Sequence, residues 1–148
     1  MLHNAQGEPI PVHAVVNSGA SHSVVTRDTL RRLDLLGAVE ESNIPTFLNA
    51  DGNRGRAAGR IRGLQVSTGD MTTLLDPYVS NALNYQILLG TDFLYPIRAS
   101  ISYGSNRLEY DNDSDQRGSI PIHFLRGGGL AAYYTPANDP ESEGEPET

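Results

Sequence analysis

Cysteine and lysine are both missing from this chain of 148 residues. The absence of cysteine excludes a disulfide framework, a thiolate zinc site and a cysteine nucleophile. The four histidines are too far apart to form a zinc motif such as HExxH. We therefore expect no metal site of the common kinds, and every basic side chain of the protein is an arginine.

Long hydrophobic runs are also missing. No apolar stretch approaches the roughly 20 residues that span a bilayer, and no charged-then-apolar signal peptide opens the sequence. The formal charge is −7 and the isoelectric point is about 4.9, which argues mildly against a nucleic-acid-binding protein. We expect a protein that is not secreted and has neither a membrane nor a nucleic acid as its partner.

The N-terminal part predicts a strand, a polar loop and a helix in succession. Apolar and polar residues alternate over 8–16, which is the pattern of a strand with one packed face. The packed face would carry Ile10, Val12, Ala14 and Val16. A small polar loop, residues 17–21, follows the strand. Thr26 can then cap a short helix, which we expect to end at Gly37.

The rest of the chain predicts strands joined by tight turns. Asp51-Gly52 is a strong hairpin signal within the stretch 46–75. Thr91 or Asp92 can cap a brief helix that Pro96 ends. The other predicted strands are 78–79, 87–89, 99–103 and 107–110. The sequence therefore predicts a mainly β protein with one or two short helices.

One domain accounts for most of the length. We expect it to cover residues 1–125, with a core over about 8–110, an acidic linker at 111–118 and a last strand at 119–125. Residues 126–148 begin with a Gly-rich stretch, and five of the last ten residues are acidic. We expect this segment to be a disordered tail.

Two motifs and the hairpin between them resemble a known family. The motifs are Val15-Val-Asn-Ser-Gly-Ala-Ser-His-Ser-Val-Val25 and Ile87-Leu-Leu-Gly-Thr-Asp-Phe-Leu94, with Ala50-Asp-Gly52 between them. On these motifs, roughly residues 8–125 resemble the retropepsins, the retrovirus-type aspartic proteases, and above all those of gypsy-type retroelements and their domesticated cellular relatives. The resemblance implies an acid-protease fold: an all-β, mainly antiparallel closed barrel with one or two short helices, one lobe per chain, acting as a homodimer.

The resemblance places Asn17 where the family has its catalytic aspartate. In the family each subunit supplies one carboxylate, and the two share a proton because both cannot ionise together. One carboxylate takes a proton from the attacking water while the other polarises the peptide carbonyl. An amide cannot accept that proton at ordinary pH, although it is nearly isosteric with a carboxyl group. We therefore expect a chain that folds like a protease and does not cut.

Other residues receive roles from the resemblance. Ser18 matches a hydroxyl that bonds across the dimer, and Gly19 allows close approach of the substrate backbone. Ser21 and Thr91 stand where many retroviral members carry an ion pair, so a lighter polar contact is expected there. The hairpin matches the flap that closes over substrate. The predicted substrate-binding residues are Ala20, Ser21, His22, Ala50, Asp51, Gly52, Asn53 and Leu89, although His22 could equally be an ordinary surface histidine.

The family resemblance implies an endopeptidase that processes polyprotein substrates, bound in extended form, with water as the nucleophile and no cofactor. Its expected location is the cytoplasm or a virus-like particle. Three interpretations of Asn17 remain open: an engineered inactivation, a natural pseudoprotease that serves as a dimerisation or peptide-binding module, or an ordinary turn without protease ancestry. We expect no catalytic role for Asp92.

Overall fold

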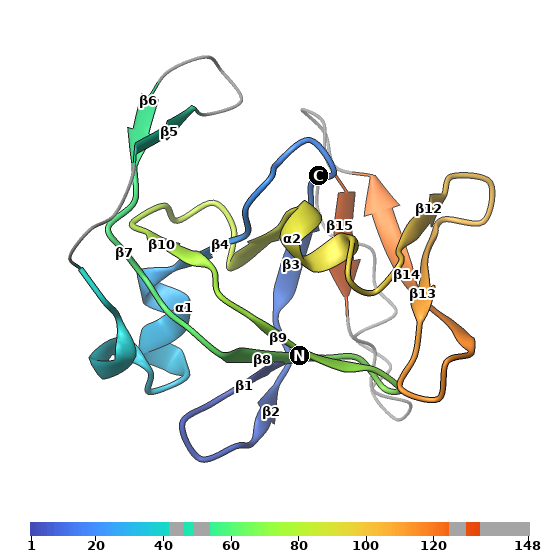
Figure 1. The fold of residues 1–148 in the computed structure, drawn as a ribbon, viewed down its shortest axis with the longest axis horizontal. Helices are drawn as coiled ribbons and strands as arrows, with labels where there is room; N and C mark the ends of the chain where they lie inside the picture. The colour runs from blue at the N-terminus through green and yellow to red at the C-terminus, as the bar shows by residue number, and fades with distance from the viewer. Residues whose placement is uncertain (42–45, 49–53, 125–129, 134–148) are drawn as a thin grey trace.

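The computed structural model describes residues 1–41, 46–48, 54–124 and 130–133. The largest sheet has nine strands, and the helices are short (Figure 1). The nine strands in spatial order are β12 (Ser100–Ser102), β13 (Arg107–Asp111), β14 (Arg117–Phe124), β15 (Leu130–Tyr133), β3 (His13–Val16), β11 (Ile87–Leu89), β4 (Val24–Thr26), β10 (Tyr78–Ser80) and β7 (Gly59–Arg60). The helices are α1 (Arg27–Arg32), α2 (Thr91–Leu94) and the 3₁₀ turn η1 (Leu36–Ala38).

Two smaller sheets complete the described structure. The four-stranded sheet has the order β2 (Pro9–Ile10), β1 (Leu2–His3), β8 (Leu64–Ser67) and β9 (Thr72–Leu75). The hairpin of β5 (Thr46–Leu48) and β6 (Arg54–Arg56) extends away from the body of the molecule beyond β7 (Figure 1). All strand pairs are antiparallel except β3–β11 and β4–β10, which confirms the mainly antiparallel β prediction.

The predicted closed barrel is wrong for the part of the chain that the structure describes. The nine-stranded sheet ends at β12 and β7, which lie at opposite sides of the molecule (Figure 1). A barrel would need hydrogen bonds between these two edges, but among the described residues β12 pairs with β13, and β7 pairs with β10 and forms a single-residue bridge to Glu40. The sheet is therefore open, and the core is closed by the four-stranded sheet packing beneath it.

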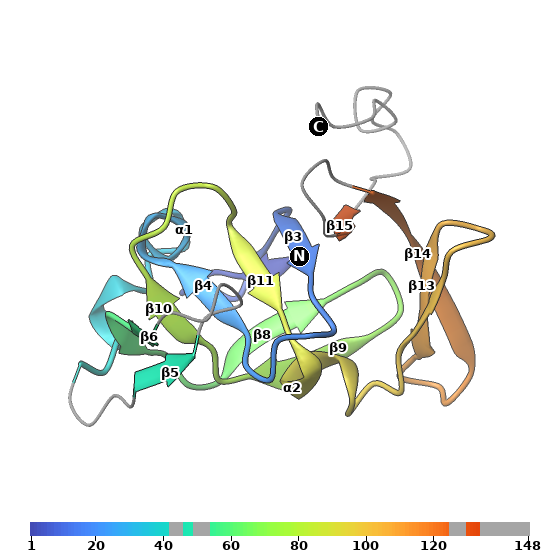
Figure 2. The same ribbon diagram turned by 90° about the horizontal axis from the view of Figure 1, so that it is seen from above.

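The centre of the large sheet determines where the polar loop of residues 17–21 lies. Strand β11 runs between β3 and β4, parallel to the first and antiparallel to the second (Figure 2). Leu89 pairs with Val16, so both parallel strands end at the same edge of the sheet. The residues that follow them, Asn17 and Gly90, consequently leave the sheet side by side.

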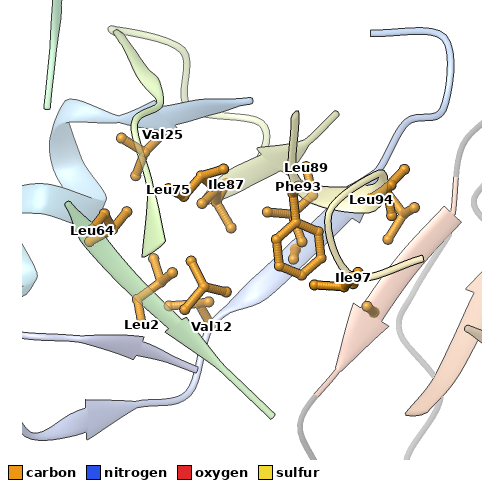
Figure 3. Packing of buried hydrophobic residues seen from close by; sticks show 14 of the residues in the cluster. Leu2, Val12, Val25, Leu64, Leu75, Ile87, Leu89, Phe93, Leu94 and Ile97 are labelled. Atoms are coloured by element: carbon orange, nitrogen blue, oxygen red, sulfur yellow. The ribbon is translucent and has the colours of Figure 1, made fainter. Parts of the chain in front are cut away.

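The core lies between the large and the four-stranded sheets. The predicted alternation is confirmed, because Val12, Ala14 and Val16 are buried and Ile10 packs against the same cluster. Figure 3 shows Val12 among side chains from β1, β8, β11 and the segment around α2. The labelled core residues are Leu2, Val12, Val25, Leu64, Leu75, Ile87, Leu89, Phe93, Leu94 and Ile97. This packing holds the end of β11 and the start of α2 in place from the core side of the sheet.

Helix α1 begins as predicted and ends earlier. The Thr26 hydroxyl accepts the backbone N–H of Thr29, which is the expected N-cap bond. Leu33 forms the C-cap instead of Gly37, because Asp34 adopts the left-handed conformation, with φ of +58°, and breaks the helical path.

The C-terminal part is more ordered than the sequence suggested. Three residues of the predicted linker, Asp111, Arg117 and Gly118, belong to strands β13 and β14. The other five form the tight turn between these strands, which is closed by Asn112, whose Oδ1 accepts two backbone N–H groups. The predicted tail contains β15, which pairs with β14 on one side and with β3 on the other. The boundary at residue 125 is therefore too early, because the sheet continues to Tyr133. Residues 134–148 lie outside the described part.

Candidate active site

The loop after β3 is held by hydrogen bonds of its first residue, Asn17. The Asn17 N–H donates to the Leu89 carbonyl at 2.9 Å, which anchors the loop to the end of β11. Asn17 Oδ1 accepts the Gly19 N–H at 2.9 Å, and its backbone carbonyl accepts the Ala20 N–H at 3.1 Å. The first of these is an Asx turn, in which the side chain acts as an extra backbone carbonyl. Asn17 is half-buried, while Ser18 and Gly19 are exposed.

Ser23 and Asp92 support this loop from within the protein. Ser23 is fully buried. Its backbone N–H and its hydroxyl donate to the two oxygens of Asp92, at 2.8 and 2.6 Å, and the hydroxyl also accepts the Gly90 N–H at 3.0 Å. One carboxylate therefore joins the end of the loop to the start of α2. Asp92 acts as a structural acceptor, and its carboxylate is turned towards Ser23.

This arrangement corrects the predicted capping of α2. The N-cap residue is Gly90, which has no side chain to offer, and neither Thr91 nor Asp92 caps the helix. Asp92 is recruited by Ser23 because β4 runs antiparallel to β11 and brings the residue before Val24 opposite the end of β11. Sequence reasoning missed Ser23, whose only signal was a small polar residue directly before an apolar strand.

Gly90 allows the two loops to touch. A Cβ atom at this position would lie 2.6 Å from the Ala20 carbonyl oxygen and 2.9 Å from that of His22. The next residue, Thr91, donates its N–H to the Ala20 carbonyl at 2.8 Å and its hydroxyl to the Ser21 carbonyl at 3.4 Å. The expected polar contact between positions 21 and 91 is thus present, but it uses the backbone of Ser21.

His22 lies on the exposed side of the loop and contacts an aromatic ring. Its imidazole meets the Tyr78 ring edge to face, with centroids 5.3 Å apart. The Arg60 guanidinium lies over the same ring, 4.9 Å from its centroid. These three side chains connect the loop with β7. The β5–β6 hairpin precedes β7 in the sequence.

The structure brings together residues 17–22 and the end of β11. Leu89 contributes through its carbonyl, whereas its side chain is buried in the core (Figure 3) and not available for the predicted substrate contact. Ala50, Asp51, Gly52 and Asn53 lie outside the described residues. The arms on either side of them do pair, with Leu48 opposite Arg54, so the predicted hairpin forms.

The chemistry available at this site is hydrogen bonding. An amide, a hydroxyl and backbone N–H groups can hold an extended polar backbone, but an amide cannot move a proton at ordinary pH. The described residues contain no group of three or more His, Asp or Glu side chains that could hold a metal ion. In the same part of the chain, no helix is long and apolar enough to cross a bilayer.

The loop, the parallel pair of strands that carries it and the glycine packed against it define a retropepsin-like fold. The sequence gives the family. Residues 4–95 match the family model described as "gag-polyprotein putative aspartyl protease". The chain therefore belongs to this family of retroviral-type aspartyl proteases.

A solved structure with a similar fold is the retroviral protease-like domain of Ddi1 from Leishmania major. The TM-score is 0.59, with 24% sequence identity over 86% of this chain and 87% of that chain. At this identity the similarity establishes the fold. No individual curated protein gives a significant sequence match.

Proposed function

We propose that this chain is the protease domain of a homodimeric aspartic endopeptidase that cuts polyprotein segments bound in extended form, and that Asn17 occupies the catalytic position and makes this form inactive. Two copies would each supply one Asn17 loop, because the described residues of one chain contain a single loop of this kind. The cytoplasm or a virus-like particle is the location we propose for it.

The observation that carries the proposal is the way the Asn17 side chain is held. Within the described residues only the side-chain oxygen makes a hydrogen bond, as the acceptor for the Gly19 N–H at 2.9 Å. A carboxylate could make the same hydrogen bond, since it also offers an acceptor oxygen in that place. The second atom of the group, Nδ2, donates to no acceptor among the residues that the structure describes. Replacing that nitrogen with oxygen would therefore break no described contact.

The proposal of a dimer rests on the exposure of the loop. Ser18 is exposed, and its hydroxyl makes no hydrogen bond within the described residues. A second copy facing the first would place the two Ser18 hydroxyls and the two residue-17 side chains together. Two carboxyl groups at close range would then share one proton, which is the state that aspartic proteolysis requires.

Asn17 itself favours a second candidate function. A chain that keeps the loop but lacks the carboxylate could serve as a pseudoprotease, a dimerisation or peptide-binding module. Extended peptides can bind such a groove through backbone hydrogen bonds without any proton transfer. The two candidates differ in what restoring the carboxylate would do.

The test is the Asn17→Asp variant, assayed beside the original chain on a peptide library from acidic to neutral pH. Proteolysis by the variant alone, blocked by a pepstatin-like inhibitor, would support the endopeptidase. The matched control is Asn106→Asp, which makes the same chemical change in the exposed β12–β13 turn and should remain inactive. Light scattering reports the oligomeric state. An Asn17→Asp protein that is dimeric but inactive would favour the pseudoprotease, and a monomer would refute both the homodimeric endopeptidase and the dimerisation module.

A further inference from the structure

Three asparagines of the described chain share one geometry. In each, the side-chain Oδ1 accepts the backbone N–H of the residue two positions on. The bonds are Gln6 N to Asn4 (3.0 Å), Gly19 N to Asn17 (2.9 Å) and Ser114 N to Asn112 (2.9 Å). A backbone N–H aimed at a carbonyl oxygen stabilises the negative charge that forms there when a nucleophile attacks the carbon. All three side chains are therefore activated towards the next backbone nitrogen along the chain.

Asn4 and Asn112 are nevertheless held in place. At both sites the attacking backbone N–H and the carboxamide nitrogen, which would have to leave, donate to acceptors elsewhere. These four bonds are Ala5 N to Leu33 O (2.9 Å), Asn4 Nδ2 to Glu8 Oε1 (3.2 Å), Asp113 N to Asp70 O (3.0 Å) and Asn112 Nδ2 to Asp70 Oδ2 (3.2 Å). Attack would require breaking both bonds at either site.

Asn17 has neither restraint. Across the ranges that the structure describes, neither the Ser18 N–H nor Asn17 Nδ2 donates a hydrogen bond. Ser18 is also exposed and small, so its side chain does not shield the nitrogen. In the whole sequence, Asn17 is the only asparagine followed by serine or glycine. The loop thus combines an activated carbonyl, a free nucleophile and a free leaving group.

We propose that Asn17 is a site of spontaneous deamidation, through which the chain generates its own aspartate at position 17. The Ser18 nitrogen attacks Cγ of Asn17 and loses its proton to water, water returns one proton to Nδ2, and the Cγ–Nδ2 bond breaks as ammonia leaves. The resulting succinimide is opened by one water molecule, which leaves a carboxylate. One water is consumed and one ammonia is released. That the new carboxylate switches on proteolysis rests on the proposed function.

The succinimide can open in two ways, and only one product suits the site. Opening at the ring carbonyl derived from the side chain gives an ordinary aspartate, whose oxygen can keep the Gly19 N–H. Opening at the backbone carbonyl gives isoaspartate, which inserts a methylene group into the chain. Such an insertion conflicts with the bonds that fix the backbone on both sides, from Asn17 N to Leu89 O and from Ala20 N to Asn17 O.

The test is a time course on the full chain, incubated in neutral to mildly alkaline buffer and analysed by mass spectrometric peptide mapping. Each restraining hydrogen bond is worth about a factor of two to ten, so Asn17 should convert about tenfold or more faster than Asn4 and Asn112. In urea this advantage should shrink, because unfolding releases the other two sites. Equal rates in the folded protein, or an advantage unchanged in urea, would overturn the inference.

Activity is read separately, with Asn17→Asp as the positive control. If both subunits need the carboxylate, activity should grow with the square of the fraction of ordinary aspartate at position 17. The Asn17→Gln variant, whose longer side chain cannot form the same five-membered ring, should stay unmodified and inactive. Aged protein rich in aspartate but inactive, beside an active Asn17→Asp variant, would overturn the activation. If Asn17→Asp is itself inactive while Asn17 deamidates, the proposed function fails and the modification site stands.

Discussion

Replacing Gly90 with alanine should damage both the stability of the protein and the geometry of the Asn17 loop. The added methyl carbon would lie 2.6 Å from the Ala20 carbonyl oxygen, 2.9 Å from the His22 carbonyl oxygen and 3.0 Å from the His22 carbonyl carbon. All three are backbone atoms, so no flexible side chain can move aside. Overpacking of this kind lowers the free energy of unfolding by about 1–3 kcal/mol. We expect a loss of about 3 kcal/mol, because the atoms that the methyl group meets all belong to the backbone.

A loss of about 3 kcal/mol corresponds to a fall in Tm of about 6–12 °C for a domain of this size. The free energy of unfolding is measured by urea denaturation and Tm by circular dichroism. Gly37→Ala is the matched control, since a Cβ there has nothing within 4 Å and the residue does not have positive φ. It should change the free energy of unfolding by less than about 1 kcal/mol.

The same substitution tests the coupling between the two loops. To relieve the clash, the Ala20–His22 backbone must move away from Gly90, which would lengthen the 2.8 Å bond from Thr91 N to the Ala20 carbonyl. In the Asn17→Asp background we therefore expect Gly90→Ala to lower proteolysis by more than the loss of folded protein explains. A Gly90→Ala protein as stable as the original would refute the close packing that we describe.

Two further predictions concern buried polar contacts. Ser23→Ala removes the acceptor of the Gly90 N–H and the donor to Asp92, and should lower the free energy of unfolding, measured by urea denaturation, by about 1–3 kcal/mol. The control Ser105→Ala, in an exposed turn, should change it by no more than about 0.5 kcal/mol. Equal effects would contradict the supporting role of Ser23. Burial, together with the hydrogen bond to Asp70, raises the pKa of Tyr110 from 10.0 to about 12. Because the folded-state pKa lies above the unfolded value, the stabilisation from Tyr110 is complete below pH 10 and is lost as the pH rises towards about 12. Tyr110→Phe should abolish this part of the alkaline loss of stability, and identical pH profiles for the two proteins would be evidence against it.

Patterns that depend on near neighbours were readable from the sequence. Thr26 caps α1 because its partner is three residues away. The alternating burial within β3, where Ala14 and Val16 are buried, follows from the two-residue period of a strand. The family resemblance also led us to expect a polar contact between positions 21 and 91, and the Thr91 hydroxyl does bond to the Ser21 carbonyl. In these cases the residues that decide the structure are close together or belong to a recognisable pair of motifs.

Features that depend on distant partners were missed. Leu130–Tyr133 reads Leu-Ala-Ala-Tyr after three glycines, without alternation or a turn signal that predicts a strand. It becomes one because β14 and β3 hydrogen-bond to it from both sides. Asp92 had an obvious local role as a helix cap, but its partner Ser23 is 69 residues away. A short strand that pairs on both sides, and a hydrogen-bond acceptor far from its donor in the sequence, are both determined by the tertiary fold. Neither leaves a clear local pattern in the sequence.

The structure also explains how the loop forms with an amide at position 17. The contacts that position Asn17 come from its backbone N–H, its backbone carbonyl and one side-chain oxygen. The contacts that position the loop as a whole come from Ser23, Gly90 and Asp92. None of these depends on the ionisation of the residue at position 17. Folding and proton transfer are therefore separable at this site: the amide can stand in the loop without weakening it, and a carboxylate formed there would enter a site that is already built.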